Sequence, residues 1–374
     1  MDRIKVALCL PGGGVTGAMY QIGALSALED SIEGLDARSF DFYIGTSSGA
    51  IVSAALAGGI QVQRLYRALL DPADSFFPLE RSHLIRMDFA EWRRTIVTAA
   101  GALRSSVLSL ASRPPSPKDL WEQLDRFYDS LPAGLFRLDA FERFLEDFFR
   151  RRGVSNRFAG LPRPLRVVAH DLDTGERVLF GDEGFDDVSV ARACCASTAL
   201  PLFYSPVRIG DRHYIDGGIG RVAHMDVAER EGVQLVVLVN PMVPVHAVQT
   251  GVPTGHGSRP SVRDKGLMWV YNQAMRIGVH ARLHHGLTDV GYGDRPSGES
   301  IPPLGPALRM PRLVIEPEPT DAVLFMHNPA SFAARRTILE YAYKTTRDRV
   351  ARWIRANMST LEKAGFRPAP GVAI

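Results

Sequence analysis

Three short segments of the sequence combine glycine with residue types that support acyl-transfer chemistry. Gly12-Gly13-Gly14 follows a short apolar run, Ser47 lies at the centre of Gly45-Thr46-Ser47-Ser48-Gly49, and Asp216 precedes Gly217-Gly218. A serine hydroxyl can attack a carbonyl carbon, a carboxylate can accept its proton, and backbone N–H groups of a glycine loop can bind the resulting oxyanion. These segments make Ser47 a candidate nucleophile and Asp216 a candidate proton acceptor, and by itself Asp216 could equally be an ordinary turn aspartate.

The pentapeptide around Ser47 fits the G-x-S-x-G pattern of a nucleophile elbow. In an elbow the serine occupies a sharp turn between a strand and a helix, and Gly45 and Gly49 must be small because the two backbones come close there. The N-terminus of the following helix places N–H dipoles near the charge that develops during attack. An ordinary helix N-cap would explain Ser47 equally well, so this pattern alone leaves both interpretations open.

The segment Gly12-Gly13-Gly14-Val15-Thr16-Gly17 could bind an anion, because consecutive glycines allow several N–H groups to point to one place. A nucleotide phosphate is disfavoured, since no Walker lysine–serine pair follows and the second strand leads to Ser47 instead of an acidic residue. We therefore expect Gly12, Gly13 and Gly14 to form an oxyanion hole, with Gly17 in the same motif. A glycine turn without a ligand is the alternative.

The candidate base, Asp216, follows an expected strand that includes His213-Tyr214-Ile215. An exposed aspartate has a pKa near 3.9 and is a weak base at neutral pH, so Asp216 must be partly buried to act as a base. Histidine is the more usual base, and ten are present. None lies in a local motif that marks a triad histidine, and His170 and His224 are the two that would have to be reconsidered first.

Apolar runs and helical spacing predict the elements that must position these segments. Two strands, Ile4–Leu10 and Phe40–Ile44, are each followed by a tight glycine turn and then by a helix, Ala18–Glu29 and Ala50–Ala57. Two consecutive strand–turn–helix units predict an α/β fold with a parallel sheet. Further strands are expected at Leu165–Ala169, Val178–Phe180, Val207–Ile209, Leu235–Asn240 and Leu313–Ile315, with a turn at Asp173-Thr174-Gly175.

Three further segments have helical spacing, at residues 92–112, 267–281 and 331–361. The first has an apolar face flanked by arginines. It is expected either to pack on the core or to serve as a lid or membrane-facing element. Residues 241–264 and 291–311 are rich in proline, glycine and serine, and are expected to be long loops.

The sequence contains no internal repeat and no evident linker. We therefore expect one domain over residues 1–374. Its motif-bearing core spans residues 4–240, and a loop-rich and helical extension at 241–374 packs on it.

Composition and cysteine spacing indicate which binding partners and which cellular compartment to expect. The chain has 374 residues, 45% of them hydrophobic, and a formal net charge of +3, which gives no indication of nucleic-acid binding. The spacing of Cys9, Cys194 and Cys195 fits no zinc pattern, and reduced buried thiols favour the cytoplasm. No cofactor is expected. Neither a signal peptide nor a membrane span is evident. A peripheral membrane contact and the oligomeric state are left open.

Taken together and in this order, the segments resemble the patatin-like phospholipase family. Two more support the resemblance: Ala196–Pro201 resembles the family's A-S-x-A-x-P stretch, and Val168–Glu176 is similar to the strand–turn–strand ahead of it. The matches run from Ile4 to Val239. The resemblance implies a three-layer α/β/α sandwich with a mainly parallel central sheet, of the FabD/lysophospholipase-like type. It also implies hydrolysis of lipid acyl esters by a Ser47–Asp216 dyad without histidine or metal.

Two departures from the family pattern accompany the resemblance. Thr16 stands where the family usually carries a basic residue, and Val222-Ala223-His224 replaces an Asn-x-Pro turn.

An acyltransferase or thioesterase could use the same dyad, because water and a second acceptor share one acyl-enzyme. A non-catalytic lipid-binding protein is the alternative from another class, and the joint presence of Ser47, the glycine loop and Asp216 argues against it.

Overall fold

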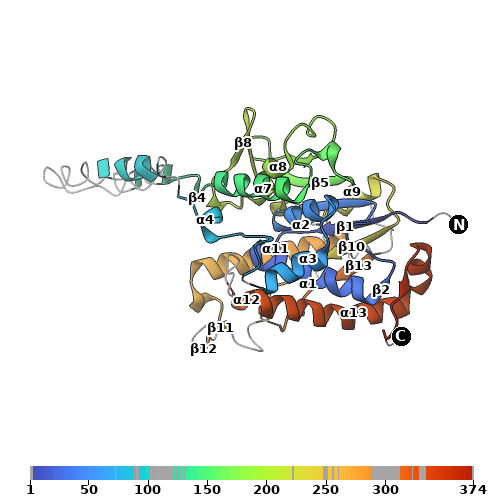
Figure 1. Cartoon of the computed structure of the whole chain (residues 1–374). Helices are drawn as coiled ribbons and strands as arrows, with labels where there is room; N and C mark the ends of the chain where they lie inside the picture. Colours follow the sequence, from blue (N-terminus) through green and yellow to red (C-terminus); the bar gives the residue numbers. More distant parts are fainter. Residues whose placement is uncertain are drawn as a thin grey trace, which may run out of the picture.

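A central sheet organises the molecule (Figure 1). Eight of the described strands form this sheet. The computed structural model describes residues 3–71, 73–87, 89, 92–98, 100–101, 104, 121–122, 125, 128–129, 131–220, 223–246, 252–254, 257–259, 261–287, 312–321, 323–327 and 334–372. The strand order is β13-β10-β1-β3-β5-β9-β8, with β6 paired to β5. The five strands from β13 to β5 are parallel, and β6, β8 and β9 are antiparallel to their neighbours.

The strands of the central sheet are β1 (Val6–Leu10), β3 (Phe42–Thr46), β5 (Leu165–Asp171), β6 (Arg177–Phe180), β8 (Val207–Ile209), β9 (Arg212–Asp216), β10 (Leu235–Val239) and β13 (Arg312–Ile315). Three short pairs lie outside it: β2 (Ile32–Glu33) with β14 (Arg367–Pro368), β4 (Gly134–Phe136) with β7 (Leu202–Tyr204), and β11 (Val252–Thr254) with β12 (Gly257–Arg259).

The helices whose bounds lie within the described residues are α1 (Gly14–Ser31), α2 (Ser48–Ala57), α3 (Val62–Leu70), α4 (Arg81–Leu84), α7 (Asp139–Arg152), α8 (Val190–Thr198), α9 (Met225–Arg230), α11 (Leu267–Leu287), α12 (Val323–Met326) and α13 (Arg335–Lys363). Short 3₁₀ turns are η1 (Phe158–Gly160), η2 (Gly217–Ile219) and η3 (Arg263–Lys265).

The two faces of the sheet belong to two separate hydrophobic cores. Along β1, Val6, Leu8 and Leu10 enter one core together with side chains of α1, α2, α7, α8 and α13. The alternate residues Ala7 and Cys9 enter the other core, with side chains of α9 and α11. Since successive strand residues point to opposite faces, helices cover both sides. The expected three-layer α/β/α sandwich with a mainly parallel sheet is confirmed.

The expected strands and the first helices are confirmed with small shifts at their ends. One difference matters for the site: α1 begins at Gly14, so the expected start at Ala18 is wrong by one turn. Gly14 has φ 65°, a left-handed conformation that glycine adopts without strain, and Gly17 N already donates to Gly13 O at 3.0 Å. The glycine loop is therefore the N-terminus of α1.

The expected loop at 241–264 is wrong in part. Residues 252–254 and 257–259 form the antiparallel pair β11–β12, in which Val252 is in register with Arg259. The expected loop at 291–311 lies outside the described residues. The C-terminal segments join the same framework: β13 pairs with β10, and α13 packs along α1. The three cysteines are buried and unpaired, and burial raises the pKa of each thiol.

The expected helix at 92–112 is described only in part. Residues 92–98, 100–101 and 104 are helical, and residues 99, 102–103 and 105–112 lie outside the described residues. This part of the chain extends away from the sheet (cyan in Figure 1). Ile96 and Val97 are 61% and 65% exposed. The described turns therefore do not bury these two apolar side chains in either core. None of the described helices is long and apolar enough to cross a membrane.

Candidate active site

Ser47 occupies the sharp turn between β3 and α2. Its backbone has φ 54° and ψ −129°, a conformation that a non-glycine residue rarely adopts. The neighbouring glycines are required by the close approach of the two elements. A Cβ on Gly45 would lie 2.4 Å from Ala50 Cα, and one on Gly49 would lie 2.0 Å from the carbonyl oxygen of Leu10. Strain of this kind is retained only where the surroundings hold it, as at nucleophile elbows.

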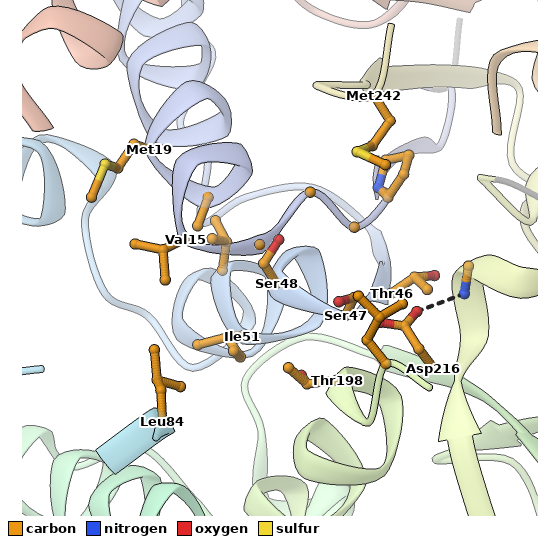
Figure 2. A pocket seen from close by; sticks show the side chains of 18 of the residues that line it. Val15, Met19, Thr46, Ser47, Ser48, Ile51, Leu84, Thr198, Asp216 and Met242 are labelled. Atoms are coloured by element: carbon orange, nitrogen blue, oxygen red, sulfur yellow. Dashed lines mark hydrogen bonds between the residues drawn. The ribbon is translucent and has the colours of Figure 1, made fainter. Parts of the chain in front are cut away.

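Strand register brings Asp216 to Ser47. Both β3 and β9 pair with the same edge of β5 and approach each other end to end. Thr46, the last residue of β3, pairs with Val168, and Asp216, the last residue of β9, pairs with the next residue, Ala169. The antiparallel strand β9 therefore ends where the elbow begins, although the two segments are far apart in the sequence. Figure 2 shows Ser47 beside Asp216.

Asp216 is buried, and Gly218 N donates a hydrogen bond to its Oδ1 at 2.8 Å. The Ser47 side chain lies beside the same carboxylate. Burial raises the pKa of Asp216 to about 6, and the neighbouring Gly218 N–H and Ser47 hydroxyl lower it less than burial raises it. A carboxylate with this pKa is a stronger base than an exposed one and is still largely ionised at neutral pH. Partial burial, which the sequence interpretation required, is thus present.

Helix α8 and the turn after it hold both members of the pair. Ser47 N donates to the hydroxyl of Ser197 at 2.8 Å, and that hydroxyl donates to Val168 O. Asp216 N donates to Ala199 O at 3.0 Å. From the sequence, Ala196–Pro201 is only a stretch that resembles the family, and no role is predicted for Ser197. The partners of the Ser197 hydroxyl are distant in sequence, so its two hydrogen bonds are evident only in the folded structure.

The glycine loop lies against the Ser47 side chain. A Cβ on Gly12 would lie 2.8 Å from Ser47 Cβ and 3.3 Å from its Oγ, so only a glycine backbone can pass there. Gly13 is the N-cap of α1 and Gly14 its first residue, so the unbonded N–H groups of the first turn open beside the hydroxyl. This geometry can bind a developing oxyanion.

Thr16, which stands where the family usually carries a basic residue, supports this loop. Thr16 is buried, and its hydroxyl donates to Gly13 O at 3.4 Å. A second support comes from Pro241, whose ring would clash with a Cβ on Gly13 at 2.6 Å. The buried Arg276 of α11 donates to Pro241 O and to Val243 O. The loop is therefore fixed by packing and hydrogen bonds on both sides.

The two histidines nearest to the sequence motifs, His170 and His224, have other contacts. His170 packs against Gly220, where a Cβ would lie 2.3 Å from its Nε2, and burial lowers the pKa of its imidazole. His224 is buried at the wall of the cavity, and its Nδ1 lies 3.3 Å from the Arg177 guanidinium, which also pairs with Asp226. The structure thus brings Ser47 together with Asp216, whereas these imidazoles contact Gly220 and Arg177.

A cavity of about 260 Å³ opens beside Ser47 and Asp216. Away from the pair its walls are almost entirely aliphatic and aromatic, as Figure 2 shows for Val15, Met19, Ile51 and Leu84. Further apolar lining comes from Ala18, Ile22, Val52, Leu65, Leu69, Phe77, Phe141, Phe148, Met268, Tyr271, Met275 and Val279. A site with polar groups at one end and an apolar extension suits a ligand with a reactive head and a hydrocarbon chain.

Solved structures similar to this chain include VipD, ExoU and a human phospholipase A2. VipD from Legionella pneumophila is 16% identical, with 94% of this chain and 67% of VipD covered and a TM-score of 0.36. ExoU in its complex with SpcU from Pseudomonas aeruginosa is 15% identical, with 99% and 58% covered and a TM-score of 0.38. Human GIVD cytosolic phospholipase A2 is 13% identical, with 96% and 60% covered and a TM-score of 0.33.

Comparison of sequences finds a curated relative and a family. The uncharacterized protein YqhO of Bacillus subtilis (strain 168) is 25% identical over 229 residues, which are 56% of this chain and 61% of YqhO. The chain thus matches less than two thirds of that relative's length. The family model of the patatin-like phospholipases matches residues 8–228, a span that includes the glycine loop, Ser47, Ser197 and Asp216.

Proposed function

The chain belongs to the patatin-like phospholipase family, and from this membership we propose that it hydrolyses acyl ester bonds of lipids through Ser47 and Asp216. The observation that carries the proposal is the position of the Ser47 side chain beside a buried carboxylate that lines an apolar cavity. A serine hydroxyl, a base and an apolar cavity are the three requirements of such a reaction.

The first half-reaction forms an acyl-enzyme. Ser47 Oγ attacks the carbonyl carbon of the ester while its proton passes to Asp216. The carbonyl oxygen becomes an oxyanion, which accepts hydrogen bonds from the N–H groups of Gly12, Gly13 and Gly14. Collapse of this intermediate breaks the ester C–O bond, and the proton on Asp216 passes to the departing alkoxide. The acyl group is then bonded to Ser47 Oγ.

The second half-reaction returns the free enzyme. Asp216 accepts a proton from a water molecule while the water oxygen attacks the carbonyl carbon of the acyl-enzyme. The same N–H groups bind the second oxyanion. Collapse breaks the bond to Ser47 Oγ, which regains its proton, and a carboxylic acid leaves. An acceptor alcohol in place of water would make the reaction an acyl transfer, so the acceptor decides between hydrolase and transferase.

The cavity indicates the substrate class. Its lining offers dispersion and hydrophobic contacts to an acyl chain, and Asp216, His224 and Arg335 are the acidic and basic residues of this lining among the described ones. With Thr16 in place of a basic residue, the α1 N-terminus offers no side-chain cation to a phosphate. We therefore expect recognition through the acyl chain more than through the head group.

A chain-length series tests this proposal. Purified protein is given p-nitrophenyl esters of increasing acyl length beside intact phospholipids and lysophospholipids, and released acid is measured. We expect kcat/KM to rise with chain length until the cavity is full, and to fall by at least about 10³-fold in Ser47→Ala. Activity that is the same in Ser47→Ala and wild type would overturn the proposal. Ser53→Ala is the matched control, since Ser53 is a buried serine of α2, the helix that follows Ser47, and lies outside the cavity lining.

We also propose that the described apolar side chains exposed between residues 89 and 121 contact a membrane surface. They include Phe89, Ile96, Val97 and Trp121, which are 61–76% exposed. Such side chains can enter the interface of a bilayer. We expect Ile96→Asp with Val97→Asp to reduce sedimentation with liposomes, and Leu172→Asp, at an exposed turn elsewhere, to leave it unchanged. Equal sedimentation of all three proteins would contradict this contact.

A further inference from the structure

Two neighbouring strands of the sheet end in a polar pair on the same edge. Val239 of β10 is in register with Ile315 of β13, so the residues that follow, Asn240 and Glu316, lie next to each other. Asn240 Nδ2 donates to Glu316 Oε1 at 2.7 Å, and Asn240 is fully buried. This hydrogen bond fixes one oxygen of a largely buried carboxylate. The other oxygen, Oε2, faces helix α11.

Helix α11 presents two imidazoles to that carboxylate. His280 and His284 are four residues apart and therefore lie on one helix face, with ring centroids 4.1 Å apart. His284 Nε2 lies 3.4 Å from Glu316 Oε2. One donor atom from each of His280, His284 and Glu316 lies within 4.8 Å of the other two. His280 Nδ1 is buried and has no hydrogen-bond partner among the described residues.

We propose that His280, His284 and Glu316 form a binding site for a divalent transition-metal ion, with zinc as the best match. Two imidazole nitrogens and one carboxylate oxygen are a donor set that zinc accepts, with water completing the coordination. Two ligands at about 2.1 Å from a tetrahedral ion are about 3.4 Å apart. The observed separation of His284 Nε2 and Glu316 Oε2 has this value.

The surroundings favour the ligand forms of these groups. Metal-binding imidazole offers an unprotonated ring nitrogen, and His280 Nδ1 is buried without a hydrogen-bond partner among the described residues. The hydrogen bond from Asn240 holds the carboxylate in the way that outer partners commonly orient metal ligands. A simple ion pair between His284 and Glu316 would need a protonated imidazole, and it would not use His280.

A bound ion would fasten α11 to the end of β13. The same helix lines the cavity through Met268, Tyr271, Met275 and Val279, and its Arg276 supports Pro241 beside the glycine loop. The ion would therefore stabilise one wall of the cavity from outside, with no part in the acyl transfer. The site does not depend on the proposed hydrolase activity, and its test needs no substrate.

The test uses the full chain without an affinity tag, after treatment with EDTA and dialysis. Zinc is titrated by calorimetry, and Co²⁺ is titrated by its visible absorption, which reports coordination geometry. We expect one ion per chain and a rise in Tm with zinc. His280→Ala, His284→Ala and Glu316→Gln should each weaken binding by more than about tenfold. His213→Ala, which removes a partly exposed histidine of β9, should leave binding unchanged.

Two results would overturn the site. One is the absence of saturable zinc and cobalt binding by well-folded wild type. The other is equal affinity in wild type and in the double variant His280→Ala with His284→Ala. Circular dichroism of each variant without metal separates a folding defect from lost binding. Weaker zinc binding in a variant whose metal-free Tm equals that of wild type supports the site directly.

Discussion

A buried carboxylate that must stay ionised determines the behaviour of the site at the residue scale. Asp216 is 5% exposed and still has to accept a proton from Ser47. Desolvation penalises its charge, while Gly218 N and the Ser47 hydroxyl offset part of that penalty. The same burial that makes Asp216 a useful base therefore lowers the stability of its ionised form. Activity and stability should depend on pH in opposite directions.

The rate should report the pKa of Asp216. The base must be ionised to accept the proton, so kcat/KM should fall as pH decreases through about 6, by about tenfold per pH unit below it. A pH profile of kcat/KM from pH 4 to 8, with a soluble ester, measures this directly. A rate that is flat down to pH 4 would contradict Asp216 as the base.

Replacing the carboxylate should stabilise the protein at alkaline pH. Because the folded-state pKa of Asp216 is raised to about 6, folding gains stability from its proton below the unfolded pKa of 3.8 and loses it as pH rises through 6. The loss is roughly 3 kcal/mol above pH 7. Asp216→Asn carries no charge, so its Tm should exceed that of wild type at pH 8 and match it near pH 4. A lower Tm than wild type at pH 8 would refute this assignment.

Ser197 should act by positioning Ser47. Without its hydroxyl, Ser47 N and Val168 O each lose a buried hydrogen-bond partner, at a cost of about 1–3 kcal/mol. A shift of the elbow should lower kcat about tenfold to hundredfold in Ser197→Ala with little change in KM. Rates normalised to the number of active sites, counted by covalent labelling of Ser47, distinguish this from a general loss of stability, which would reduce the amount of active enzyme and leave kcat per active site unchanged. Ser53→Ala, whose hydroxyl has no partner among the described residues, should leave kcat unchanged.

At the scale of elements, the crossing of β1, β3 and α2 permits the elbow. Gly49 lies so close to Leu10 that a Cβ would be 2.0 Å from its carbonyl oxygen, and backbone atoms cannot move aside cheaply. The strained backbone of Ser47 thus depends on a contact between α2 and the end of β1.

Gly49→Ala should therefore destabilise the fold severely, with a loss above about 3 kcal/mol or no soluble protein. Gly101→Ala is the matched control, because a Cβ there meets nothing within 4 Å. Urea denaturation measures both free energies of unfolding. If Gly49→Ala were as stable as Gly101→Ala, the close crossing would be wrong.

Much of this arrangement could be predicted from the sequence, for reasons that differ between elements. The runs at β1 and β3 are apolar and lead into glycine-rich turns, so their parallel pairing and the elbow follow from local pattern. The end-to-end meeting of β9 with β3 does not, because it depends on the register of both strands with β5. The start of α1 at Gly14 was missed because glycine indicates a loop by propensity. Ser197 and the His280–His284–Glu316 cluster were missed because their partners are distant in sequence.

At the scale of the whole molecule, the segment after residue 240 completes the motif-bearing core. We propose that the chain folds as one domain, since β13 extends the sheet and α13 covers α1. Gly23 of α1 lies where the two helices touch, and a Cβ there would be only 2.6 Å from Leu339 O and 2.9 Å from Ala342 Cβ. The close approach of α1 and α13 therefore requires glycine at this position.

Gly23→Ala should lower the free energy of unfolding by about 1–3 kcal/mol and shift a single cooperative transition. Gly278→Ala, on α11, is the control, since a Cβ there meets only the flexible Arg282 side chain. Calorimetry of wild type and both variants provides the measurement. Two separate transitions, of which Gly23→Ala moved only one, would show that the C-terminal part folds independently.

The most direct test of Ser47 as the nucleophile is covalent labelling with an alkyl fluorophosphonate, followed by mass spectrometry of the intact protein and its peptides. We predict one adduct per chain, located on Ser47, that forms more slowly in Asp216→Asn and as pH falls below about 6. Ser47→Ala should not be labelled. A folded wild type that remains unlabelled, or an adduct on another serine, would contradict this role of Ser47.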